Sequence, residues 1–185
     1  MPKRDFIQTI ILLVLGLATA FILNIFFFDF YQIKEVDANH YLMNGETVVV
    51  SKKAELKRGL FVLYQHDGQD HVGRILAKEK DSVTYMDDLL YLNNEIVDES
   101  YLASMKDKFQ SSSQNMGYFT SDFSLSSLVG AKGDTVPHDY FLVLNDDRQN
   151  VEDSRSFGLI AKKDIKGVID FRISPLNRFG FIEEK

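Results

Sequence analysis

An almost unbroken apolar run from Phe6 to Phe28 is the feature that most constrains this chain. The only polar interruptions are uncharged: Gln8, Thr9, Thr19 and Asn24. A helix rises about 1.5 Å per residue, so a run of this length crosses the roughly 30 Å hydrocarbon core of a bilayer. The sequence therefore predicts a transmembrane helix over residues 6–28.

The charges that flank this run predict its orientation. Lys3 and Arg4 precede it and Asp29 follows it. By the positive-inside rule, residues 1–5 are then cytoplasmic and everything after residue 30 is extracytoplasmic, which describes a single-pass protein of the cell membrane. A cleaved secretory signal is the alternative, with Ala18 and Ala20 as the small residues of a processing site. The apolar run continues well past Ala20, which favours the anchor.

Composition excludes several classes of function for the rest of the chain. The 185 residues are 45% hydrophobic, enough for one main domain with a sizeable core. A net charge of −6 gives no electrostatic basis for nucleic-acid binding. The chain has no cysteine, and its 4 histidines show no metal-ligand spacing. We therefore expect neither a metal nor another cofactor.

Short runs rich in β-branched and aromatic residues follow the apolar segment and predict a mostly β domain. They cover residues 46–50, 60–64, 71–76, 82–85, 89–92, 140–144 and 167–173. Asp67-Gly68 and Asn93-Asn94 are predicted hairpin turns. Residues 95–135 differ, with a charged, helix-like piece at 101–109 and serine-rich stretches after it. We therefore expect a β core made of residues 31–94 and 136–182, with residues 95–135 inserted as a cap or flap.

The order of these segments resembles the membrane-bound type I signal peptidases. The most specific resemblance is the stretch from Asn145 to Gly158, which carries Arg148, Asn150, Asp153, Ser154 and Arg155 in the family's order. The resemblance implies a coiled β-sheet or barrel ectodomain with a small inserted subdomain. It also implies an activity, the removal of leader peptides from exported proteins by a serine nucleophile and a lysine general base.

The residues at the family's catalytic positions do not fit that activity. The nucleophile position falls on Asp37, the base position on Gly73 and the lysine-orienting position on Val151. Glu35 stands where the family often has a residue that assists the oxyanion hole. A serine–lysine mechanism needs a hydroxyl next to a neutral amine, and a carboxylate there would repel an oxyanion. No catalytic residue is therefore predicted to be intact.

The same resemblance suggests a binding cleft and a structural box. The cleft candidates are Ile33, Glu35, Asp37, Ala38, Leu42, Val72 and Gly73. Two interpretations of them stay open: they contact an extended peptide, or they are ordinary core and loop residues. In the box, Arg148 and Arg155 are expected to brace a turn by pairing with Asp146, Asp147 or Asp153.

Loss of the dyad makes the chain similar to the catalytically degenerate signal-peptidase-like proteins found with streptococcal pilus genes. That resemblance implies a non-catalytic role in pilus assembly beside a sortase, in which the chain binds pilin or sortase by adding a strand to a sheet edge. An active leader peptidase with unorthodox residues is the alternative. A membrane tether with no peptide-binding role is the third hypothesis.

Overall fold

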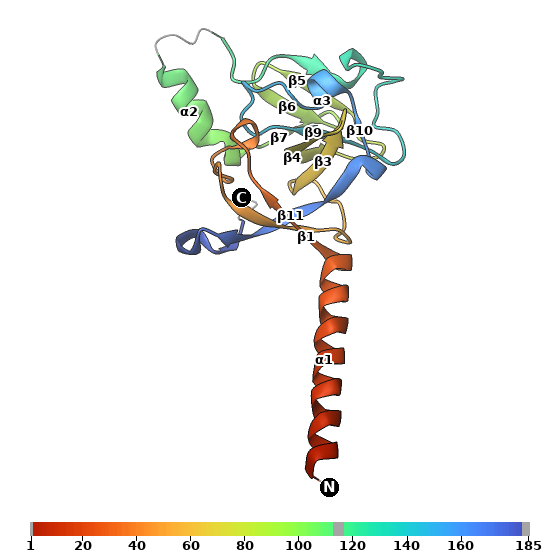
Figure 1. Ribbon diagram of the computed structural model, residues 1–185. Helices are drawn as coiled ribbons and strands as arrows, with labels where there is room; N and C mark the ends of the chain where they lie inside the picture. The colour runs from red at the N-terminus through yellow and green to blue at the C-terminus, as the bar shows by residue number, and fades with distance from the viewer. Residues whose placement is uncertain (1, 113–116, 183–185) are drawn as a thin grey trace.

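The computed structural model describes residues 2–112 and 117–182, with the side chains of residues 2–5, 20 and 22–24 left out. Helix α1 (Pro2–Phe27) stands apart from a β domain and passes without a linker into strand β1 (Phe28–Gln32) (Figure 1). Counting described residues only, no helix is both long enough and apolar enough to cross a membrane. The span predicted at residues 6–28 includes positions 20 and 22–24, whose side chains lie outside that description.

The larger of two sheets has 8 strands, in the order β1-β2-β11-β3-β4-β9-β10, with β12 paired to β11. Its further strands are β2 (Thr47–Ser51), β3 (Phe61–His66), β4 (Gln69–Ala77), β9 (Tyr140–Leu144), β10 (Ile160–Ala161), β11 (Ile165–Ser174) and β12 (Gly180–Phe181). Every pairing in it is antiparallel. The mostly β class is therefore confirmed.

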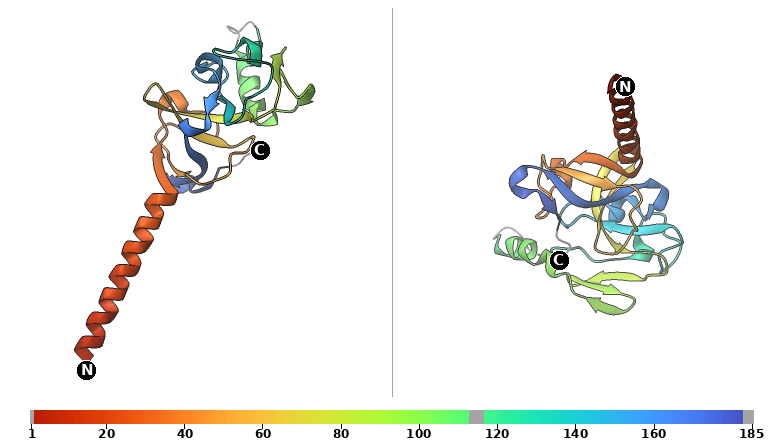
Figure 2. Two further views of the ribbon diagram at one scale, coloured as in Figure 1. Left: turned by 90° about the vertical axis from the view of Figure 1, so that its right-hand side faces the viewer. Right: turned by 90° about the horizontal axis from the view of Figure 1, so that it is seen from below.

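A second antiparallel sheet of 4 strands has the order β7-β6-β5-β8. It consists of β5 (Val83–Met86), β6 (Leu89–Leu92), β7 (Glu95–Val97) and β8 (Phe123–Ser124). Strands β5 and β6 fall inside the segment expected to be core, yet they pair with the insertion and not with the larger sheet. Figure 2 shows this sheet at the end of the β domain that lies away from α1.

The predicted turns are present where the strands reverse. Asp67 and Gly68 both have positive φ between β3 and β4, and so do Asn93 and Asn94 between β6 and β7. Two-residue hairpins need this left-handed backbone, which asparagine, aspartate and glycine adopt most readily.

Helices are short outside α1. They are α2 (Ala103–Ser111) in the insertion, α3 (Ser154–Phe157), and the 3₁₀ turns η1 (Glu35–Asp37), η2 (Ser100–Leu102), η3 (Leu125–Ser127), η4 (Lys162–Asp164) and η5 (Leu176–Arg178). The turn η1 positions the family's nucleophile site, and α3 begins inside the predicted structural box.

The core divides into three buried clusters that follow the strand alternation. One cluster lies under the second sheet, another packs around β3, β9 and β11, and the third lies beneath β1, β2 and the inward face of β4. The third cluster contains Ile33, Leu42 and Val72. It is the cluster that supports the site described next.

Candidate functional site

Asp37, at the family's nucleophile position, is buried although it lies in a loop between strands. The turn η1 directs it against the edge of β4, and only 2% of its surface is exposed. Its Oδ1 accepts the backbone N–H of Val72 at 3.0 Å, and its Oδ2 accepts the hydroxyl of Tyr31 at 3.0 Å. The carboxylate thus sits one residue from Gly73, so the chain brings the family's nucleophile and base positions together.

Burial raises the pKa of Asp37, while the hydrogen bonds from Val72 and Tyr31 act in the opposite direction without cancelling it. Burial and the nearby Asp37 charge also raise the pKa of the Tyr31 phenol. The Tyr31 hydroxyl is therefore held protonated as a donor to the carboxylate. Asp37 thus accepts hydrogen bonds from Tyr31 and Val72. A serine nucleophile would instead donate its proton to a base.

Gly73, at the family's base position, is pressed against the neighbouring strand. A Cβ added to it would lie 2.7 Å from Cγ1 of Val143 and 3.0 Å from the carbonyl oxygen of Leu144. Real Cβ atoms do not approach other atoms so closely, so any side chain here requires the Val143 side chain and the Leu144 carbonyl to move. Position 73 therefore lacks an amine and also the room in which a lysine side chain would begin.

Val151, at the lysine-orienting position, has an apolar side chain that is 47% exposed. Beside it, Asn150 donates from Nδ2 to the backbone carbonyl of Val36 at 2.8 Å, which ties this loop to the turn that carries Asp37. Glu35 is exposed at the start of that turn. Within residues 2–112 and 117–182, no serine hydroxyl is hydrogen-bonded to a lysine amine, and no group of His, Asp and Glu side chains is placed to hold a metal ion.

The residue after Gly73 carries a buried ion pair. Arg74 forms a two-pronged contact with Asp146, Nε to Oδ1 at 2.9 Å and Nη2 to Oδ2 at 2.6 Å, with both side chains at most 1% exposed. Its guanidinium also stacks on Phe61 and Tyr101, 4.0 and 4.3 Å from the ring centroids. Burial lowers the pKa of Arg74, but the hydrogen bonds and charge of Asp146 outweigh that effect and raise it. The pair locks β4 to the loop that follows β9.

The structural box holds that loop in shape, with one unexpected pairing. Asp153 caps α3, accepts the N–H of Asn145 at 2.9 Å and pairs with Arg155 at 2.7 Å. Ser154 accepts the N–H of Val143 at 3.0 Å. Arg148 pairs instead with Glu99, at 2.7 Å, a residue of the insertion.

The Arg148–Glu99 pair is part of a buried network between the β core and the insertion. Glu99 also accepts the hydroxyls of Tyr85 and Tyr101. Burial raises the pKa of Glu99, but the charge of Arg148 and the hydrogen bonds from the two tyrosines outweigh that effect. The net shift is downward, so the carboxylate stays ionised. The insertion is thus attached to the core by charge as well as by packing.

The cleft candidates lie close together, but several of them are core. Ile33, Leu42 and Val72 are at most 3% exposed and belong to the buried cluster beneath β1 and β2, against which Ala38 packs half-buried. Their surroundings match the interpretation as core residues. A role in contacting a peptide stays a prediction for Asp37, Glu35 and the adjoining edge of β4.

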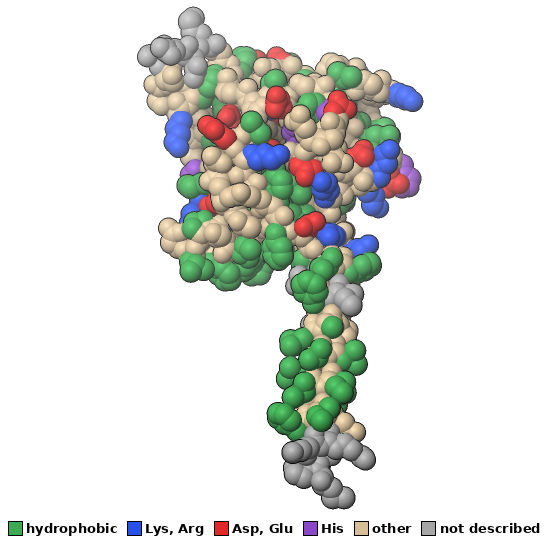
Figure 3. Space-filling view, viewed as in Figure 1, with side chains coloured by type: hydrophobic (Ala, Val, Ile, Leu, Met, Phe, Trp, Pro, Cys, Tyr) green, Lys and Arg blue, Asp and Glu red, His purple; other side chains and the backbone are tan. Residues whose placement is uncertain are grey.

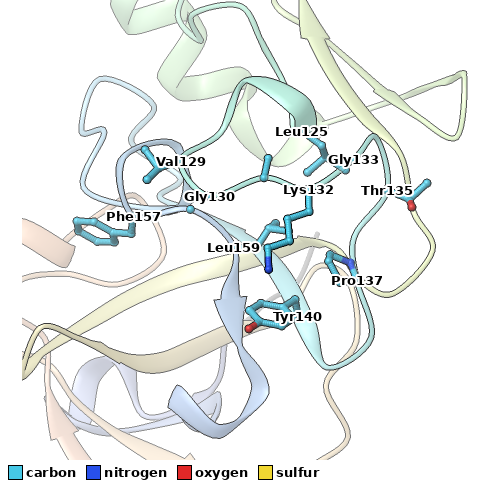
Figure 4. Close-up of a pocket in the computed structure, with 12 residues that line it drawn as sticks. Leu125, Val129, Gly130, Lys132, Gly133, Thr135, Pro137, Tyr140, Phe157 and Leu159 are labelled. Carbon is cyan, nitrogen blue, oxygen red and sulfur yellow. The ribbon is translucent and has the colours of Figure 1, made fainter.

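A separate cavity of about 340 Å³ lies between the segment after η3, β9 and α3. Its lining includes Val129, Tyr140, Phe157 and Leu159, with Lys132 reaching across toward Tyr140 (Figure 4). None of the residues at the family's catalytic positions lines it.

Three residues important to this site were not singled out from the sequence. Tyr31 holds Asp37, Val143 occupies the space beside Gly73, and Glu99 neutralises Arg148. Tyr31 and Val143 lie in ordinary strand patterns. Glu99 could have been noticed only as a carboxylate two residues before Tyr101-Leu102, which is a weak signal.

Comparison with known proteins places the chain among the signal peptidases. The family model described as signal peptidase, peptidase S26, matches residues 6–174. Signal peptidase IB of Staphylococcus aureus strain MRSA252 is 31% identical, covering 97% of this chain and 95% of the relative. A protein named inactive signal peptidase IA, from S. aureus strain Mu50, is also 31% identical, covering 95% and 96%.

A solved structure extends the agreement to the fold. The crystal structure of a signal peptidase I from Enterococcus faecalis V583 superposes with a TM-score of 0.56 at 32% identity, covering 62% of this chain and 97% of the other. A relative named as a signal peptidase and a relative named as inactive are therefore equally similar in sequence. By its matched length and by its fold, the chain belongs to the signal peptidase I family.

Proposed function

We propose that this chain is a membrane-anchored signal peptidase relative that binds an extended peptide without cleaving it, acting in pilus assembly on a pilin or a sortase. The observation that carries the proposal is the pair of residues at the family's catalytic positions. Asp37 is a hydrogen-bond acceptor fixed by Tyr31 and Val72, and Gly73 is closed against Val143. Both arrangements oppose acyl transfer.

The expected loss of peptidase activity is large. Removing one member of a nucleophile–base unit costs about 10⁴–10⁶ in turnover, and removing the second adds little because the unit already fails. The buried carboxylate of Asp37 would also lie where negative charge develops in a tetrahedral intermediate, which raises the barrier further. Arg74 cannot act as the base, since its guanidinium is ion-paired and remains protonated.

The edge of β4 offers a place for strand addition. Strand β4 pairs with β3 along Gln69–Arg74, whereas β9 pairs with it only from Arg74 onward. In the described part of the chain, the other edge of residues 69–72 is therefore not covered by a strand, and its Val72 N–H is taken by Asp37. An extended segment that added to this edge would replace the Asp37 contact with a main-chain hydrogen bond.

The proposal includes the anchor. Along α1 the described apolar side chains are all exposed, from Phe6 at 67% to Phe26 at 58%. An isolated helix with apolar side chains on every face is stable where the solvent is itself apolar. In this arrangement the β domain is extracytoplasmic, on the side where exported pilin subunits emerge.

Crosslinking in cells tests the binding role. A photoreactive residue replaces Glu35, which is exposed beside Asp37, and in a matched control replaces Glu55, an exposed glutamate on the loop between β2 and β3. We expect position 35 to crosslink to a pilin or to the sortase and position 55 not to do so. Equal crosslinking at both positions, or none at 35 while the partners are present, contradicts the proposal.

A cleavage assay tests the missing activity. The full chain in detergent is incubated with a leader-bearing preprotein, with an active signal peptidase I as the positive control. We expect no specific product. Specific cleavage that disappears in Asp37→Ala would establish an active peptidase with unorthodox residues, which is the competing function.

A further inference from the structure

The cavity between the segment after η3, strand β9 and α3 lies apart from the family's catalytic positions and takes no part in the proposed function. Its volume of about 340 Å³ is at the lower end of the range of about 300–1,000 Å³ that is usual for ligand sites. Leu125 in its lining belongs to the core under the second sheet, against which Ala131 and Leu159 also pack. Phe157, in the same lining, packs against the core around β3 and β9. Two core clusters therefore support the walls, so the cavity is formed before a ligand arrives.

One end of the cavity is closed by the backbone of its own walls. A Cβ built on Gly158 would lie 2.4 Å from the carbonyl oxygen of Val129, so the two walls touch there. Gly158 and Gly130 both have positive φ, at 79° and 70°, which glycine adopts without strain. In Figure 4 Val129 lies at this end of the cavity and Tyr140 at the other. A chain that enters beside Tyr140 therefore cannot pass straight through and must end inside.

The polar groups of the cavity favour an anion. The Lys132 ammonium reaches across it toward Tyr140, whose hydroxyl can also donate a hydrogen bond (Figure 4). None of the 12 lining residues is Asp or Glu, and among the side chains that the structure describes none forms an ion pair with Lys132. Figure 3 shows acidic and basic side chains interspersed over the β domain, and the chain carries a net charge of −6. A concavity with an unpaired lysine and no carboxylate in its lining is thus a local exception, and an anionic group is the ligand that complements it.

A second hollow shares Tyr140 with the cavity and has an excess of positive charge. It has a volume of about 420 Å³ and is lined by Asp139, Tyr140, Ala161, Lys162 and Lys163. Asp139 pairs with Lys162 at 3.6 Å, so Lys163 supplies the excess. Ala161 belongs to β10, which ends the strand order of the larger sheet and, in the described part of the chain, pairs with β9 alone. An extended segment can approach the cavity along this strand edge, where its main chain has hydrogen-bonding partners.

We propose that the cavity binds the C-terminal end of a peptide, with the terminal carboxylate against Lys132 and an apolar last side chain between Val129 and Leu159. The closed end accounts for a chain terminus, the lysine for its carboxylate, and the apolar walls for the last side chain. The edge of β10 accounts for the main chain that precedes it. This site uses neither Asp37 nor the edge of β4, so it goes beyond the proposed function and can fail independently of it. A fatty acid also joins a carboxylate to an apolar chain, but it would gain nothing from a strand edge.

Peptide binding to the full chain in nanodiscs tests this site. The probe is a pool of fluorescein-labelled hexapeptides with random sequence before a C-terminal leucine, and binding is measured by fluorescence anisotropy. The same pool with an amidated C-terminus lacks the carboxylate, and we expect it to bind about 10- to 100-fold more weakly. The same pool ending in serine lacks the apolar side chain and should bind about 10-fold more weakly.

Variants of Lys132, whose side chain is exposed, locate the binding. Lys132→Met removes the charge but keeps an unbranched side chain, and it should weaken binding of the free-acid pool by about 10- to 100-fold. Lys132→Arg keeps the charge and should retain most of the binding. Lys57→Met, at an exposed lysine on the loop between β2 and β3, is the matched control and should bind as the unaltered chain does. Because both lysines are exposed, all three variants should keep the melting temperature, which separates lost binding from lost folding.

Equal binding of the free-acid and amidated pools would overturn the proposal, and so would full binding by Lys132→Met or no binding of any pool. Dodecanoate is the probe for the competing occupant, and its heat of binding is corrected with empty nanodiscs. Binding of dodecanoate that is lost in Lys132→Met, without binding of the peptide pool, would assign the cavity to fatty acids. That result would also overturn the proposal.

Discussion

Replacement of Gly73 by alanine should destabilise the protein although it adds only one methyl group. Its Cβ would lie 2.7 Å from Val143 Cγ1, which is much shorter than the ordinary contact distance of 3.4–4 Å. Overpacking of a core costs about 1–3 kcal/mol. The reduced entropy of the unfolded chain returns about 0.4–1 kcal/mol of that. The expected net loss is therefore on the order of 1–2 kcal/mol.

A loss of this size lowers the melting temperature of a chain of this length by about 2–8 °C, measured by circular dichroism of the full chain in detergent. Gly133→Ala is the matched control, since a Cβ there meets no atom within 4 Å, and it should be neutral or slightly stabilising. The addition of Val143→Ala removes the clashing methyl group, so the double variant should be more stable than the two single losses predict, by about 0.5–3 kcal/mol. An unchanged melting temperature for Gly73→Ala, or strict additivity with Val143→Ala, would refute the reasoning.

Three further predictions concern the buried polar groups. Burial raises the pKa of Asp37, so the native state binds its proton more tightly than the unfolded state does. The protein therefore loses stability as the pH rises from the ordinary pKa of an aspartate to the raised pKa of Asp37. Asp37→Asn should flatten that part of a plot of melting temperature against pH, and an unchanged slope would contradict the shift. Arg74→Met should cost about 3–5 kcal/mol because it leaves Asp146 buried without a partner, while the addition of Asp146→Leu should recover much of the loss in thermal unfolding; a double variant no better than the single one would refute the pairing argument. Tyr101→Phe deletes a hydroxyl bonded to both Glu99 and Arg148, at a cost of about 1–3 kcal/mol, and should speed amide hydrogen exchange in α2; equal exchange in both proteins would show that this network does not hold the insertion.

The sequence predicts local structure well and distant contacts poorly. Strands β6 and β9 begin and end where alternation and turn residues place them, because the signals for both lie within a few residues. Strand β1 was missed because it starts at Phe28, the last residue of the apolar run, and is only 5 residues long. A period of two over five residues cannot be separated from such a run.

The site shows the same division between local and distant information. Family positions place Asp37 and Gly73, but the burial of Asp37 depends on Tyr31 and on a strand 35 residues away. Arg148 was expected to pair with a neighbouring aspartate. It pairs with Glu99, 49 residues earlier, because the fold brings the start of the insertion beside that loop.

Successive residues of β4 explain how a protein without catalytic chemistry can retain a useful site. The N–H of Val72 donates to Asp37 at the edge that no described strand pairs with, Gly73 lets β9 approach closely, and Arg74 fixes the strand to Asp146. The loop that bears Asp146 also bears Asn150, which holds the backbone of Val36 beside Asp37. Both sides of the proposed binding edge are thus fixed by hydrogen bonds before a ligand arrives, buried ones at Val72 and Arg74 and an exposed one at Asn150. Since ordering of side chains and loops is a main cost of association, such an edge can bind an extended segment with little loss of its own entropy, and this needs neither a nucleophile nor a base.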